Sequence, residues 1–177
     1  VEIQGFPSLY AFQPQFAHQY VESFGLPDLP YYFGGLTDAS YKELLGRAIL
    51  NGHDPENVVL LEIDPERQKT LCDFKATQDV LGIPYVCITS LRKQGRKLFY
   101  ERDGRLVPIH RIYNRVIADE LMRLKLAIPF DFRDDLERGG AILGGLCERR
   151  SSQRQAARDH DRQAGKQNHI LVRARAC

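Results

Sequence analysis

No apolar run in the sequence approaches the length of about 18 residues that a membrane-spanning helix needs. The sequence also shows no leader in which a basic segment precedes an apolar one. Its four cysteines form no Cys-x-x-Cys pair and have no histidine at metal-ligand spacing. No glycine-rich phosphate loop follows any predicted strand. These absences argue against a membrane partner, a disulfide scaffold and a P-loop nucleotide site. We expect a globular cytoplasmic protein whose thiols stay reduced.

Charged and aromatic residues are divided unequally along the chain. From residue 138 to 177, nine basic residues, eight of them arginine, stand against three acidic ones, and no residue is aromatic. All 8 tyrosines and 9 phenylalanines precede this segment, where acidic residues outnumber basic ones. Sequence of the C-terminal kind cannot bury enough apolar surface to offset its ordering entropy. We therefore predict one domain over 1–137 and a disordered tail over 138–177.

The basic tail allows three interpretations. Its arginines could bind nucleic acid or another anionic surface. It lacks the aromatic residues that stack on bases and any RNA-binding motif, so nucleic acid is not the partner we expect. The tail could also come from a shifted reading frame and never have been selected as protein. We favour a tail without an evolved function, and keep a basic-tailed binding module as an alternative.

Residues 1–137 alternate between helical and extended patterns. The alternation of Val1 to Gln4 predicts a first strand. Apolar residues at helical spacing predict a helix after Pro14 that stops at Gly25, and a second over 38–51 with Tyr41, Leu44, Leu45, Ala48 and Ile49 on one face. The apolar run VVLLEI, at 58–63, predicts a buried strand. Asp64-Pro65 predicts the start of a third helix that carries Leu71, Phe74 and Leu81 inward and ends at Gly82.

The second half of the domain is predicted to consist mainly of strands. PYVCIT, at 84–89, predicts a strand parallel to 58–63 in a βαβ unit. Residues 97–109 predict a hairpin around Asp103-Gly104. A strand over 110–117 and a helix over 118–126 complete the pattern. The fold class we expect is α/β, with a partial parallel or mixed sheet and flanking helices.

Three segments in this order, EIQGFPSLY, VVLLEIDPERQKT and RIYNRVIADEL, resemble the substrate-side region of circularly permuted ATP-grasp ligases. These are relatives of eukaryotic-type glutathione synthase and of glutathionylspermidine synthase, including a group of uncharacterised bacterial proteins. The resemblance covers about residues 1–137. It implies a substrate-side, pre-ATP-grasp-like domain and carboxylate–amine ligation with Mg²⁺ and ATP. The implied partners are a small acid or amine substrate.

The resemblance implies a role for each of three residues near the start of the chain. Such ligases carry Glu-x-Asn on a strand that binds Mg²⁺, and here Glu2 matches the acid while Gln4 stands at the asparagine. Two positions apart on a strand, both would point to one face and could offer oxygen to a hard cation. Ser8 falls in the loop that holds the peptide substrate. The alternative for Glu2 and Gln4 is a solvated strand face.

A second group of site residues lies in IYNRV. The resemblance implies that Arg115 reaches a substrate carboxylate, with Tyr113 and Asn114 beside it. A guanidinium suits this role because its planar fork can bind a carboxylate through two hydrogen bonds. The alternative is an ion pair between Arg115 and Asp119 or Glu120 at the next helix start.

We expect this chain to be an internal piece of such a ligase, without the nucleotide lobes and inactive in ligation by itself. No tight cofactor binding is then expected, and the exposed first strand would favour a homodimer. An alternative is a stand-alone hydrolase or metal-dependent enzyme in which one of four side chains works in a cleft. These four are Glu2, His53, Asp54 and Asp64.

Overall fold

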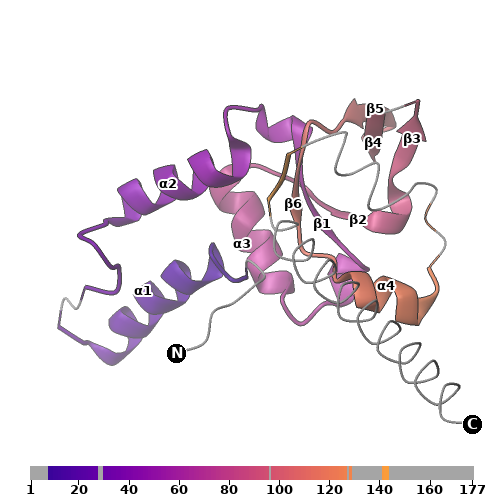
Figure 1. Ribbon diagram of the computed structural model, residues 1–177. Helices are drawn as coiled ribbons and strands as arrows, with labels where there is room; N and C mark the ends of the chain where they lie inside the picture. Colours follow the sequence, from indigo (N-terminus) through magenta and orange to yellow (C-terminus); the bar gives the residue numbers. More distant parts are fainter. Residues whose placement is uncertain (1–7, 28–29, 96, 127, 129–140, 144–177) are drawn as a thin grey trace, which may run out of the picture.

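The computed structural model describes residues 8–27, 30–95, 97–126, 128 and 141–143 (Figure 1). The predicted first strand, with Glu2, Gln4 and the strand edge proposed for a homodimer, lies outside the described residues. So does the predicted tail, apart from Ala141–Leu143. Within the described ranges, no helix is both long enough and apolar enough to cross a bilayer.

The centre of the fold is a parallel sheet in the order β2-β1-β6-β7. Its strands are β1 (Val58–Glu62), β2 (Tyr85–Cys87), β6 (Arg111–Asn114) and β7 (Ala141–Leu143). All five residues of β1 are buried, because helices or other strands cover both faces of the sheet. The predicted parallel pairing of the strands in 58–63 and 84–89 is confirmed.

The two faces of the sheet are covered by different elements. One face, with Val58 and Leu60, packs against α2 (Asp38–Leu50) and α3 (Leu71–Leu81). The other, with Val59 and Leu61, packs against a smaller antiparallel sheet and α4 (Ala118–Leu124). That sheet has the order β3-β4-β5, formed by Arg92–Gln94, Lys97–Arg102 and Arg105–Pro108. The residues described therefore form a mixed α/β fold, as the sequence predicts.

Local signals located several elements correctly. The hairpin turns at Asp103 and Gly104, whose φ angles of +51° and +74° suit the tight turn that an Asp-Gly pair favours. The first helix, α1 (Phe12–Phe24), ends at Gly25 in the left-handed conformation, as predicted. α2 begins at Asp38 behind a capping box in which the Thr37 and Ser40 side chains each accept the other's backbone N–H.

Three predictions of detail are wrong. Asp64-Pro65 does not start the third helix: Asp64 has a φ of +44°, its side chain caps nothing, and Pro65–Arg67 form only a 3-10 turn before α3. The sequence predicts Leu44 and Ala48 on the inner face of α2, but both are exposed, since that helix buries only Leu45 and Ile49. The strand at 84–89 is shorter than predicted, because Ile88–Ser90 already turn as a 3-10 helix.

β7 departs from the prediction of a disordered tail from residue 138. Its three residues pair in parallel with β6, with Ile142 opposite Ile112. The pairing gives backbone groups at the edge of β6 hydrogen-bond partners. The paired residues are the apolar triplet AIL.

Candidate functional site

The order in which the chain adds strands to the parallel sheet reverses between β1 and β6, since β2 follows on one side and β7 on the other. These strands are neighbours, but β1 continues into α3 on one face and β6 continues into α4 on the other. The chain segments that follow the two strands therefore diverge at their carboxyl ends. In open α/β sheets, ligands bind in the crevice that such a divergence creates. This junction is the candidate site.

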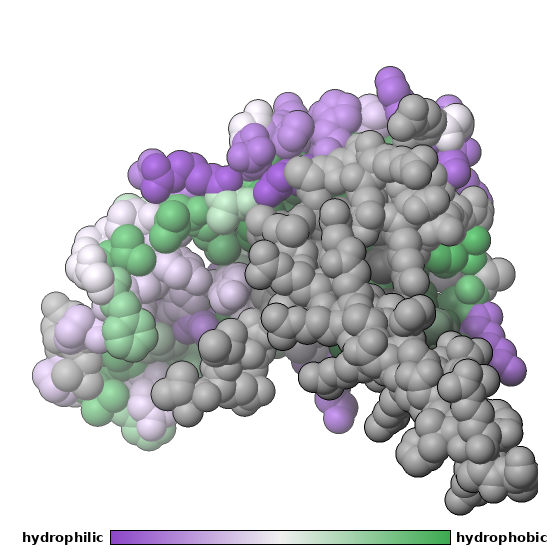
Figure 2. All heavy atoms as spheres, in the orientation of Figure 1, coloured by the Kyte–Doolittle hydropathy of each residue, from purple (hydrophilic) through white to green (hydrophobic). Residues whose placement is uncertain are grey.

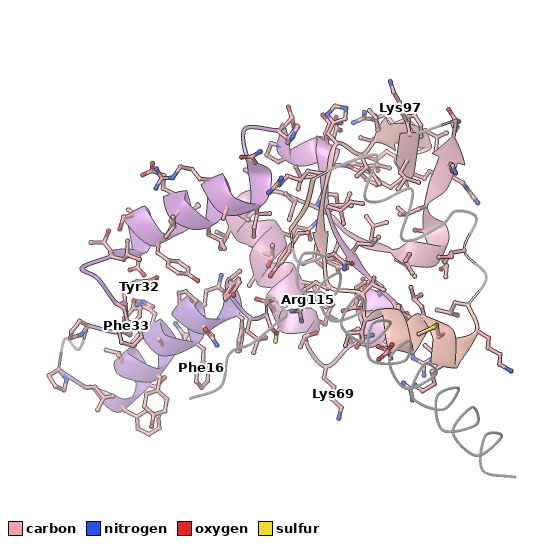
Figure 3. All side chains as sticks on the ribbon, viewed as in Figure 1. Phe16, Tyr32, Phe33, Lys69, Lys97 and Arg115 are labelled. Carbon is pink, nitrogen blue, oxygen red and sulfur yellow. The ribbon has the colours of Figure 1, made fainter. Side chains whose placement is uncertain are left out.

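Glu62 and Arg115 lie at the carboxyl ends of these two strands. Leu61 is paired with Asn114, and the Arg115 N–H donates to the Leu61 carbonyl at 2.9 Å. By the two-residue period of strands, Glu62 shares the α3 face with Leu60, and Arg115 shares it with Tyr113. Figure 3 shows Arg115 beside α3 at the end of β6, where its guanidinium carbon lies 5.9 Å from the centre of the Phe74 ring.

The Glu62 carboxyl group is buried, with only 6% of the residue exposed. Burial raises its pKa from 4.5 to about 7, although the Ile63 N–H and the nearby Arg115 charge act in the opposite direction. The Glu120 carboxylate raises the pKa further. Glu62 can therefore gain or lose a proton near neutral pH, as a general base or acid must. The sequence interpretation missed this residue, although an acid at the end of an apolar run was a signal for it.

Arg115 is the second buried charge at this junction, and 8% of it is exposed. A guanidinium keeps its charge inside a protein, so this position holds a fixed positive charge next to an acid that titrates. Glu120, one of the two acids in the ion-pair alternative for Arg115, lies 3.4 Å from Arg123 between oxygen and nitrogen. The ion-pair alternative for Arg115 stays a prediction.

Tyr113 and Asn114, predicted beside Arg115, are both buried but occupy different environments. The Asn114 side chain bridges the N–H and carbonyl of Val116 at 3.1 and 3.3 Å, so it shapes the loop after β6. Tyr113 is 1% exposed, and its hydroxyl has no hydrogen-bond partner in the part of the chain that the structure describes. Burial raises the pKa of Tyr113, which keeps that hydroxyl protonated.

Ser8 begins a tight turn that the Asp73 carboxylate holds in place. Backbone N–H groups of Leu9, Ala11 and Phe12 donate to the two Asp73 oxygens at 3.1, 3.2 and 3.1 Å. Asp73 is fully buried on α3 and caps the start of α1 from a different helix. Sequence reasoning missed Asp73, whose signal was an acid between apolar neighbours in LCDFKA.

The alternative set of catalytic residues does not come together. His53 and Asp54 precede β1, whereas Asp64 follows it, so the length of the strand separates them. Asp54 accepts the Glu56 N–H at 2.9 Å and starts a 3-10 turn. Glu2, the fourth member, lies outside the described residues.

The described residues do not by themselves form a magnesium site. Among them, no group of three or more His, Cys, Asp or Glu side chains could hold a metal ion. At the β1–β6 junction, the Arg115 charge lies beside Glu62, which disfavours a second cation there. Glu2 and Gln4, the ligands that the resemblance implies, are among the residues not described.

Comparisons of this chain with protein-family models, with curated proteins and with solved structures returned no match.

Proposed function

We propose that the β1–β6 junction binds the carboxylate of a small acid, as the substrate-side part of a protein resembling ATP-dependent carboxylate–amine ligases. The observation that carries the proposal is a buried arginine, Arg115, at the carboxyl end of a parallel strand where the chain direction diverges. The resemblance of RIYNRVIADEL to the family's carboxylate-binding segment assigns Arg115 the same role.

In the proposed site, Arg115 attracts and orients the acid. Its planar fork can donate two parallel hydrogen bonds to a carboxylate, and packing against Phe74 limits its freedom. Attraction to a carboxylate is stronger at this buried position than in water. The ring behind the guanidinium holds the fork in place from one side.

Glu62 would accept the proton that the amine must lose. An amine attacks an activated acid only as the free base, so its ammonium form must first lose a proton. A carboxylate with a pKa of about 7 can accept that proton at neutral pH. In ligases of this kind, ATP with Mg²⁺ supplies the phosphoryl group that activates the acid.

Acid binding and Glu62 protonation are coupled in this arrangement. A carboxylate on Arg115 would neutralise the charge that now lowers the Glu62 pKa, and would add a negative charge nearby. Binding of the acid therefore raises the pKa of Glu62 further, so the ionised fraction that can accept the proton of the amine grows only as pH rises above that value. The acid should bind more weakly as pH rises through about 7, the pKa of Glu62 in the free protein.

The test is titration of the purified chain with succinate, L-glutamate and glutathione, followed by NMR and calorimetry. Arg115→Lys should weaken binding by at least about ten-fold, because a lysine lacks the two-pronged geometry. The matched control is Arg111→Lys, on the same strand and face. The Arg111 side chain donates to the Ile49 and Ala48 carbonyls, so this change should leave acid binding intact.

Two outcomes would contradict the proposal. One is the absence of saturable binding for all three acids below about 10 mM, which is weaker than a specific site would give. The other is equal loss of binding in the Arg115 and Arg111 variants, which would indicate a general effect on folding.

A further inference from the structure

Three tyrosines form a row of rings between the loop before α2 and α2 itself. The ring centres of Tyr31 and Tyr32 are 4.8 Å apart, and those of Tyr32 and Tyr41 are 4.9 Å apart. The rings of the two pairs are tilted by 43° and 32°, so neither pair forms the flat face-to-face sandwich that aromatic quadrupoles disfavour. The row has no part in the β1–β6 junction.

One carboxylate, that of Asp38, accepts hydrogen bonds from two of these tyrosines. The same oxygen of Asp38, Oδ1, accepts hydrogen bonds from the Tyr32 hydroxyl at 2.7 Å and the Tyr31 hydroxyl at 3.2 Å. Burial and the bond to Asp38 raise the pKa of Tyr32, so its hydroxyl remains a donor at neutral pH. A negative charge is thereby fixed against aromatic rings.

The row borders a pocket of about 610 Å³ between α1, α2 and the end of α3. Tyr32, Tyr41 and Asp38 line it together with Pro14, Leu45 and Val80. This volume is in the usual range for a small-molecule site. The lining combines apolar side chains with polar and charged ones, which also include Gln15, His18, Gln19 and Lys42. Figure 2 shows hydrophobic surface along the side of α2 that faces α1, and Figure 3 shows Tyr32 between the two helices.

The start of α2 does not itself attract an anion into the pocket. The capping box between Thr37 and Ser40 satisfies N–H groups at this helix end, at 2.8 and 3.3 Å. The charge that remains there is the Asp38 carboxylate. A hard metal ion at this helix start would have the Asp38 carboxylate as a ligand but no further acidic ligands beside it, since no group of three His, Cys, Asp or Glu side chains that could hold a metal occurs in the described ranges.

We propose that this pocket binds an organic cation, a quaternary or alkylated ammonium group. The ring faces of Tyr32 and Tyr41 would attract the positive charge, and the Asp38 carboxylate would complete its neutralisation. The apolar side chains of Leu45 and Val80 would contact the alkyl substituents. A neutral ligand of the same shape would gain only the apolar contacts.

Two further side chains that can carry positive charge line the same pocket. Lys42 lies one helical turn after Asp38, is exposed, and forms no ion pair with it in the structure. His18 lines the pocket from α1. Both disfavour a cation when charged, so Lys42→Met should strengthen cation binding. The same change would weaken the binding of a zwitterion or an anion, which distinguishes the ligand classes.

The test compares choline with its uncharged analogue 3,3-dimethylbutan-1-ol on the full chain. Choline should bind at least about ten-fold more tightly, a difference of the size that cation–π and carboxylate attraction provide. Asp38→Asn and Tyr32→Leu should each lower choline affinity by about ten-fold. Matched controls are Asp103→Asn, an exposed acid on the hairpin, and Phe33→Leu, an exposed ring that does not line the pocket.

Circular dichroism and thermal unfolding establish that each variant is folded. Asp38→Asn keeps an oxygen that accepts the tyrosine hydroxyls, so its effect reports the charge rather than the loop. Equal affinity for choline and the alcohol would overturn the proposal. So would choline binding that survives both Asp38→Asn and Tyr32→Leu, or no choline binding at about 50 mM.

Discussion

β1 and α1 are both rich in apolar residues, but they are buried to opposite extents. All five residues of β1 are buried, while none of the thirteen in α1 is. On α1, the rings of Phe12, Phe16, Tyr20 and Phe24 follow each other at four-residue spacing, with centres 5.8, 6.2 and 4.6 Å apart. β1 is almost wholly apolar, whereas α1 alternates apolar and polar residues and carries its rings on one side. Their burial differs because β1 has partners on both faces and both edges.

The two segments are therefore held by different forces. β1 is stabilised by the area that it removes from water and by its strand pairing. α1 is held by the Asp73 carboxylate at its start, by packing of Phe12 against the core and by ring contacts along its own surface. The comparison teaches that an amphipathic pattern predicts a helix but not the partner that its apolar side will contact.

The largest expected effect is at Phe74, which is fully buried between α3 and the sheet. Phe74→Ala should lower the free energy of unfolding by about 3–5 kcal/mol, since it removes buried contacts and leaves a cavity. The control on α1 is Phe24→Ala, which is 65% exposed and should cost less than about 0.5 kcal/mol. Urea unfolding measures both. Similar costs would mean that α1 is buried in solution.

The next largest effect on stability is expected at Asp73, which lies on α3 and caps the start of α1. Asp73→Ala removes the acceptor for three N–H groups and should cost about 2–3 kcal/mol. Asp79→Ala, on the same helix, is the control. Hydrogen exchange should show lost protection in α1 while β1 stays protected. Uniform loss across both would show that α1 and the sheet unfold as one unit.

Replacing Glu62 should have a smaller effect on the free energy of unfolding, and this effect is a gain in stability. Between pH 4.5 and about 7 the native chain keeps a proton that the unfolded chain releases, so stability falls as pH rises through this window. Glu62→Gln avoids that loss and should be more stable by about 1–3 kcal/mol above pH 7. The gain should vanish below pH 4.5.

Unfolding measured across this range checks the Glu62 prediction, with exposed Glu101→Gln as a variant whose stability difference should not depend on pH. A stability gain at Glu62 that is constant with pH would show that burial does not raise its pKa.

The smallest effect is expected within the ring row of α1. Tyr20→Ala removes two ring contacts, with Phe16 and Phe24, at a half-exposed position. Each contact of this kind contributes about 0.5–1.5 kcal/mol when buried and less when exposed, so the cost should be about 0.5 kcal/mol. Helical circular dichroism and urea unfolding would measure it. A cost near that of Phe74→Ala would again place a partner on this face.

Elements with strong local signals could be predicted from the sequence. The Asp103-Gly104 turn fixes its hairpin within a few residues, and the run VVLLEI leaves little alternative to a buried strand. β3 was missed because its residues, Arg92–Gln94, have no apolar alternation, and their pairing depends on the hairpin beside them. Asp64-Pro65 failed as a helix start because the chain leaves β1 through a left-handed residue there.

The candidate site was only partly predictable. Arg115 is a candidate from its segment, but Glu62 is a candidate because burial raises its pKa, and burial depends on α3, which lies later in the chain. Asp38 looked like a helix start, and its contacts with Tyr31 and Tyr32 depend on a loop conformation that no local pattern encodes. Residues whose chemistry arises from distant neighbours cannot be identified by spacing alone.

The capping of α1 by Asp73 also has a consequence for synthesis on the ribosome. The acceptor for Leu9, Ala11 and Phe12 lies 61 to 64 residues further along the chain. At a synthesis rate of about 5–20 residues per second, α1 waits about 3–12 seconds before Asp73 has been made. During that time the three N–H groups at the start of α1 have no carboxylate to accept them. On the ribosome, α1 should therefore become stable only after α3 has been synthesised.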